Sequence, residues 1–169
     1  DPNCEFIELQ NIGTQSINLN LVRFTHGIDF TFGDLTLAPN AYTLVVNNPA
    51  HLEMRYGAEL PIAGQYTGLL DNKGERIVLV DAIGTVIHDF EYKDGWYDIS
   101  DGQGFSLTII NAANPDPLVW SQKIGWRPSS VVGGSPGIDD SGIVPPPGAI
   151  VINEVLSHSH DIAPDWIEL

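Results

Sequence analysis

Two histidines near the end of the sequence have the type and spacing of metal ligands. His158 and His160 are separated by one residue, so on an extended chain both imidazoles project to the same face. Together with the carboxylate of Asp161 they are ligands of the kind that zinc takes in proteins. The additional histidines and aspartates of metallohydrolase patterns do not occur at matching spacing. We therefore interpret this segment as a polar surface loop, and a zinc site is the alternative.

Three aspartates in a glycine-containing loop, residues 94–102, form a second candidate metal site. Calcium prefers hard carboxylate oxygens on flexible loops, and Asp94, Asp98 and Asp101 provide them. Their spacing does not follow the EF-hand rule, and aspartate–glycine pairs are also ordinary turn sequences. We interpret the three residues as turn residues and predict no cofactor; calcium at this loop is the alternative.

Aromatic side chains in the same loop are candidates for ligand binding. Trp96 and Tyr97 neighbour aspartates and a glutamine, a combination that stacks against sugar rings in carbohydrate-binding sandwiches. Tryptophans of a small sandwich also fill its core, and we expect this of Trp120. The sequence leaves open whether Trp96 lies in the core or binds a ligand. For His88, which shares a period-2 face with apolar residues, we expect a half-buried, hydrogen-bonded ring.

The sequence does not show an arrangement typical of catalysis. We interpret the glycines around Ser135 as a strand end, and not as the elbow that exposes a nucleophilic serine. Gly102-Gln103-Gly104 lacks the lysine and the following helix of a phosphate-binding loop. We therefore predict that the protein is not an enzyme and has no catalytic residue.

Charge excludes several classes of partner. The 7 basic and 22 acidic residues give a net charge of −15, so no basic stripe is available to bind nucleic-acid phosphates or an anionic membrane surface. No apolar run reaches the roughly 18–20 residues that a membrane helix needs. The single cysteine, Cys4, excludes an internal disulfide. We expect a protein or a glycan as the partner, and an extracellular or cell-surface location, where acidity keeps the protein in solution.

The elements that would position these residues are short strands joined by turns. Residues 17–21 alternate strictly between apolar and polar side chains, which is typical of a strand with one buried face. Two β-rich runs joined across Ala82-Ile83-Gly84 predict a hairpin. The expected strands are residues 6–9, 17–21, 29–32, 42–46, 76–81, 85–92 and 105–110.

One helix is expected among these strands. Asn48 is a typical N-cap, Pro49 a typical first helical residue and Gly57 a typical stop, so the sequence predicts a helix over residues 49–56. Many short strands with regular turn signals predict an all-β sandwich of two sheets.

The ends of the chain show an internal repeat. Residues 161–169 align with residues 1–9, and four of the nine pairs are identical. The offset of 160 residues suits a whole module and not a small solenoid unit. In this interpretation residues 149–155 are the first strand of the next module. The prolines in the connector, residues 143–148, make it stiff, and Asp139 and Asp140 before it are interpreted as a solvated linker.

The repeat predicts the domain organisation. Residues 1–142 would form a sandwich that lacks its own first strand, and residues 149–169 would be the first strands of the next repeat. A sandwich without its first strand exposes an open edge, which recruits a matching strand. We therefore expect residues 149–155 to complete a sandwich, either on their own chain or by swapping into another copy, which would give a strand-swapped homo-oligomer.

Five motifs in order resemble the lamin-tail domain family. They are Glu5–Gly13, Leu37–Tyr42, Leu70–Leu79, Asp101–Leu107 and Ser135–Gly137. The resemblance implies an immunoglobulin-like β-sandwich with one short helix and no enzymatic activity. Residues 152–155 followed by residues 165–169 resemble the opening of a second copy, as in a tandem array cut out of register. His88 stands where many members have aspartate, so no acidic site is transferred to that position.

The resemblance also implies a function. In nuclear lamins this domain is an interaction surface behind a coiled-coil rod, and similar bacterial modules occur in secreted or surface proteins. Because the sequence shows no heptad repeat, it resembles the bacterial type more closely. We expect a non-catalytic adhesion, spacer or interaction module of a repetitive secreted or cell-surface protein, which binds protein or glycan through loops. The alternative is a calcium- or zinc-dependent binding or hydrolytic domain that uses Asp94–Asp101 or the His158/His160 pair.

Overall fold

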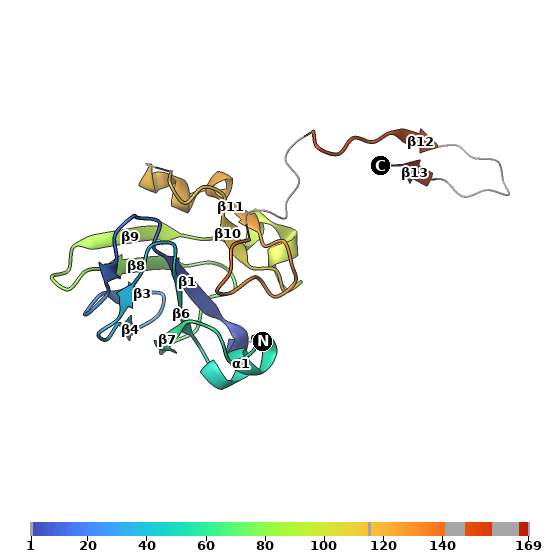
Figure 1. The fold of residues 1–169 in the computed structure, drawn as a ribbon. Helices are drawn as coiled ribbons and strands as arrows, with labels where there is room; N and C mark the ends of the chain where they lie inside the picture. Colours follow the sequence, from blue (N-terminus) through green and yellow to red (C-terminus); the bar gives the residue numbers. More distant parts are fainter. Residues whose placement is uncertain (1, 115, 141–147, 157–165, 169) are drawn as a thin grey trace.

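Two β-sheets form the body of the protein (Figure 1). The computed structural model describes residues 2–114, 116–140, 148–156 and 166–168. The first sheet has three strands in the order β1 (Phe6–Gln10), β6 (Tyr42–Val46) and β7 (Ile62–Gln65). The second sheet has four strands in the order β4 (Phe30–Thr31), β3 (Arg23–His26), β8 (Arg76–Val80) and β9 (Val86–Glu91). β1 and β6 pair antiparallel, whereas β6 and β7 pair parallel.

The main core lies between these sheets. Val45 of β6 and Ile77 of β8 belong to one buried apolar cluster, at 1% and 3% exposure, and Ile7 of β1 packs against it. Because successive side chains of a strand point to opposite faces, each sheet contributes one apolar face to this cluster. The structure therefore confirms the predicted all-β sandwich.

The one α-helix of the described residues, α1 (Pro49–Tyr56), begins and ends where its signals predict. Asn48 Oδ1 accepts a hydrogen bond from His51 N at 3.2 Å, which caps the first turn. Gly57 follows the helix with a φ of 97°, a conformation that suits glycine. Leu52 is fully buried with Leu44 on the outer face of the first sheet.

The predicted hairpin is also confirmed as β8 and β9, which pair antiparallel. Asp81 Oδ1 accepts hydrogen bonds from Ile83 N at 3.0 Å and from Thr85 N at 2.7 Å. Gly84 takes a φ of 93° in the same turn. The side chain of Asp81 thus satisfies the backbone donors that the tight turn leaves unpaired.

Several smaller elements differ from the predictions. The strand expected at residues 17–21 is only β2 (Ile17–Asn18), because Leu21 adopts a φ of 62° that ends the extended run. The strand expected at residues 105–110 is β10 (Leu107–Ile109). The remaining strands and 3₁₀ helices of the body are β5 (Thr36–Leu37), β11 (Trp126–Pro128), η1 (Pro2–Cys4), η2 (Asp94–Trp96), η3 (Asp98–Ser100), η4 (Pro117–Ser121) and η5 (Lys123–Gly125). β2 pairs with β5, and β10 pairs with β11.

The C-terminal segment forms a separate hairpin. β12 (Glu154–Leu156) pairs antiparallel with β13 (Trp166–Glu168), away from the body in Figure 1. In the described residues β12 therefore pairs with β13 and not with a strand of the body. Completion of a sandwich by residues 149–155 on their own chain stays a prediction. Swapping into another copy stays a prediction. Residues 143–147 of the proline connector lie outside the described residues.

Candidate functional site

A surface groove of about 440 Å³ lies between β9 and η4. Its lining residues are Val86, Ile87, His88 and Asp89 of β9 with Pro117, Leu118 and Trp120 of η4. The two elements are joined by a hydrogen bond from Glu91 N to Ser121 Oγ at 3.1 Å. The groove is therefore built from segments about thirty residues apart in the sequence.

Two buried tryptophans, Trp120 and Trp126, hold η4 in place. Asp116 Oδ1 accepts a hydrogen bond from Leu118 N at 2.9 Å and so caps this short helix. Trp120 is only 7% exposed, and its backbone oxygen accepts a hydrogen bond from Trp126 Nε1 at 2.7 Å. The burial predicted for Trp120 is confirmed. With Trp120 fixed inside, η4 holds Leu118 outside, where it is 70% exposed.

The groove is mainly apolar. Val86 and Ile87 of β9 are 55% and 47% exposed, and with Leu118 they offer an uncovered apolar surface. Asp89 is engaged by Arg76 in two hydrogen bonds of 2.7 Å and 2.6 Å, which lower the pKa of this carboxyl. The groove thus suits a partner that brings apolar groups.

His88 is the groove residue with an imidazole, and it differs from the expectation. Its ring lies edge-on to Trp120, with 5.9 Å between ring centroids, and the residue is exposed and not half-buried. Crowding by protein lowers the pKa of His88, because the charged imidazolium is less well solvated there. The ring of His88 thus forms part of the groove lining beside Trp120.

The aromatic candidates of the long loop lie in the core of this region. Trp96 is 8% exposed and packs against Trp126, with 6.4 Å between ring centroids. Tyr97 donates a hydrogen bond to Trp126 O at 2.8 Å, and Lys123 Nζ lies 4.4 Å from the centroid of its ring. Both side chains therefore support η4 and η5, and neither lines the groove.

The candidate metal ligands do not come together. Asp94 Oδ1 accepts a hydrogen bond from the next backbone N–H, of Gly95, at 2.5 Å, and Asp98 O accepts one from Asp101 N at 3.2 Å. Within the part of the chain that the structure describes, no three histidine, cysteine, aspartate or glutamate side chains are grouped to hold a metal ion. His158 and His160 lie outside the described residues.

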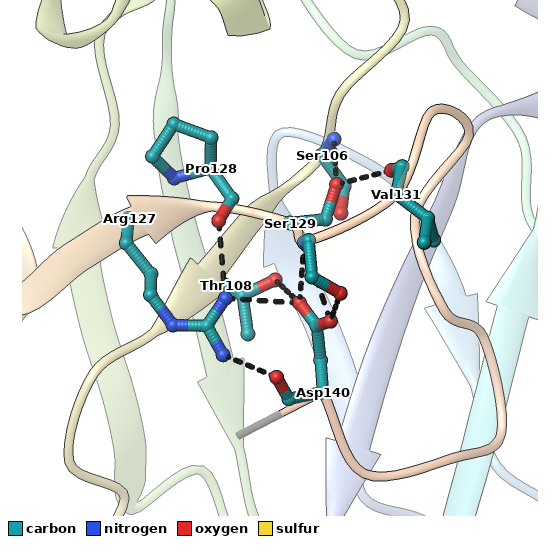
Figure 2. Close-up of polar contacts among 8 residues, drawn as sticks. Ser106, Thr108, Arg127, Pro128, Ser129, Val131 and Asp140 are labelled. Atoms are coloured by element: carbon teal, nitrogen blue, oxygen red, sulfur yellow. Dashed lines mark hydrogen bonds and ion pairs between the residues drawn. The ribbon is translucent and has the colours of Figure 1, made fainter. Parts of the chain in front are cut away.

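Asp140 is a buried polar centre, whereas the sequence predicts a solvated linker at this position. Figure 2 shows Arg127 directed at it, with Nη1 3.0 Å from Asp140 Oδ2 and Nη2 donating to Asp140 O at 2.9 Å. The backbone N–H and the hydroxyl of Ser130 both donate to Asp140 Oδ1, and Thr108 Oγ1 lies 3.4 Å from Asp140 Oδ2. Burial raises the pKa of Asp140, but the bonds from Ser130 and Arg127 outweigh it and lower this pKa. Asp140 therefore fastens the C-terminal end of the body to β10 and β11 through hydrogen bonds within the protein.

None of the helices in the described residues is long and apolar enough to cross a membrane. The groove residues were not predicted as a site. A signal was present, because Val86 and Ile87 are adjacent apolar residues, and one of two neighbouring strand side chains must face away from the core.

Comparison with known proteins identifies the family. A family model described as Lamin Tail Domain matches residues 1–94. Neither the curated proteins nor the solved structures give a match to the chain. The matched residues contain the first three motifs and all strands of both body sheets. Lamin-tail domains are non-enzymatic, immunoglobulin-like interaction domains. Because the match covers more than half of the 169 residues, this chain belongs to the lamin-tail domain family.

Proposed function

We propose that the chain is a non-catalytic adhesion, spacer or interaction module of a repetitive secreted or cell-surface protein, of the bacterial type of its family. In this proposal the groove between β9 and η4 binds a protein or a glycan. The observation that carries it is the uncovered apolar surface of Val86, Ile87 and Leu118 beside His88 and Trp120. Apolar groups around a few polar ones are typical of binding sites.

Two further features support the setting. The 160-residue repeat suits a chain built from similar modules, and the net charge of −15 favours solubility outside the cell. The two hydrogen bonds from Arg76 engage the carboxylate of Asp89, the acidic residue that lines the groove, and leave it without a free acid–base role. These observations therefore favour binding over catalysis as the role of the groove between β9 and η4.

Substitution of Leu118 by aspartate tests the groove. Leu118 is exposed, so Leu118→Asp should fold normally but place an unpaired charge against an apolar ligand surface. Binding is measured on glycan arrays and on immobilised extracellular proteins. We expect at least a tenfold loss of affinity, which corresponds to about 1.4 kcal/mol.

Ile83→Asp is the matched control, because Ile83 is 88% exposed at the tip of the β8–β9 hairpin and does not line the groove. Its binding should equal that of the unmodified chain. A ligand that binds both variants equally would contradict the groove as the site. Turnover of ester, phosphate or glycoside substrates would contradict a non-catalytic module.

A further inference from the structure

β1 is an edge strand. β6 pairs with it on one side, and in the described part of the chain no strand pairs with it on the other. Asn47 N donates to Glu5 O at 2.9 Å and Asn11 N to Ala41 O at 3.0 Å, so the odd-numbered residues of β1 bond to β6. The backbone N–H and C=O groups of Phe6, Glu8 and Gln10 therefore point to the open edge.

The C-terminal hairpin shows which strand fits this edge. β13 is the repeat of β1 at an offset of 160 residues, and β13 carries β12 on its edge. In that pair Val155 lies opposite Ile167, and Leu156 lies opposite Trp166. The same register on β1 places Val155 opposite Ile7 and Leu156 opposite Phe6.

Transfer of β12 to β1 would bury apolar surface. An isolated two-stranded hairpin is marginally stable in water, and Val155 is 55% exposed in it. On β1, Val155 would lie on the same face as Ile7, which packs against the main core. The first sheet, β1-β6-β7, would then have four strands, and the open backbone groups of β1 would be paired.

We propose that β12 of one copy of this chain adds to the open edge of β1 in a second copy. A second copy is favoured over the same chain because β12 lies away from its own body in Figure 1, and because the three consecutive prolines at positions 145–147 of the sequence predict a stiff connector. The proposal goes beyond the proposed function, since it uses the β1 edge and does not depend on the groove between β9 and η4.

Disulfide trapping between differently tagged full-length chains tests this proposal. In a Cys4→Ser background, one chain carries Gln10→Cys and the other carries Ile152→Cys. The register of β12 on β1, continued two residues beyond Glu154, places these two positions opposite each other. Cα atoms of such a hydrogen-bonded pair are about 5.5 Å apart, which suits a disulfide. We expect mixed dimers at ten times or more the yield given by Ile83→Cys in place of Gln10→Cys.

A second substitution tests whether strand pairing causes the trapping. Glu154→Pro in the Ile152→Cys chain removes the backbone N–H that would donate to Glu8 O at the open edge. Glu154 is exposed, so the body should fold but the mixed dimer should be lost. A yield no higher than that of the Ile83→Cys control would overturn the proposal. Closure of the disulfide within monomers of a Gln10→Cys/Ile152→Cys chain would also overturn it, because β12 would then complete its own body.

Discussion

Glu8 is a carboxylate that the fold holds partly out of water. Its Oε2 accepts a hydrogen bond from Gly137 N at 2.6 Å, so the side chain joins β1 to a segment 129 residues later in the sequence. Burial raises the pKa of Glu8 to about 7, although the bond from Gly137 acts in the opposite direction. The folded protein thus prefers the protonated form of this group.

The raised pKa of Glu8 predicts a loss of stability as pH rises. The group favours folding below its ordinary pKa of 4.5, and this contribution is lost as pH rises through about 7. Between pH 5 and pH 8, the loss of this contribution lowers the free energy of unfolding by roughly 2–3 kcal/mol. In denaturant unfolding, Glu8→Gln should lack this fall. An equal fall in Glu8→Gln, or its absence from the exposed control Glu53→Gln, would show that other groups cause the pH dependence.

At the scale of elements, two arginine–aspartate pairs fasten strands in different ways. Arg127 and Asp140 join β11 to the C-terminal end of the body, with side chains 17% and 3% exposed. Arg76 and Asp89 join β8 to β9 with a shorter contact of 2.6 Å, but their side chains are 54% and 37% exposed. Solvent screens the exposed pair, whereas loss of one partner leaves the buried carboxylate uncompensated.

Arg127→Leu should therefore destabilise the protein far more than Arg76→Leu. We expect about 3–5 kcal/mol for the buried pair and about 1 kcal/mol or less for the exposed one. Chemical denaturation of both variants at pH 7 measures the difference. Equal losses would contradict burial as the cause. Asp140→Asn in the Arg127→Leu background should recover part of the stability, because the uncompensated charge is removed.

The elements that the sequence predicts well are those whose signals are local. α1 follows from Asn48, Pro49 and Gly57, and the β8–β9 turn follows from Gly84 next to β-branched residues. β7 was missed because its sequence, Ile-Ala-Gly-Gln, has weak β-propensity and pairs parallel to β6 only in the folded chain. A Cβ at Gly64 would lie 2.8 Å from Phe30 Cε2, so packing, not a turn, requires this glycine.

The candidate site depended even more on tertiary structure. Trp120 was predicted in the core, but the exposure of Leu118 beside it results from η4 docking on the tryptophans, which no local pattern encodes. Asp140 was assigned to a solvated linker because its partner Arg127 lies thirteen residues away on β11. Such contacts between separate elements set burial, and burial decides what a polar residue does.

At the scale of the whole molecule, repulsion between carboxylates opposes folding. Since the chain has 7 lysines and arginines for 22 aspartates and glutamates, at least 15 carboxylates have no basic residue of their own. Compaction brings these charges closer together than in the unfolded chain. Buried pairs such as Arg127–Asp140 offset only part of this repulsion.

Salt should therefore stabilise this protein. Raising sodium chloride from 0.01 M to 0.1 M shortens the screening length from about 30 Å to about 10 Å, so repulsion across the body weakens. We expect Tm to rise by several degrees, and an equal rise in potassium chloride, because screening does not depend on the cation. A falling Tm would mean that attractive pairs dominate. At constant ionic strength, a further saturable rise with micromolar calcium would instead indicate bound ions, because specific binding, unlike screening, saturates at low concentration.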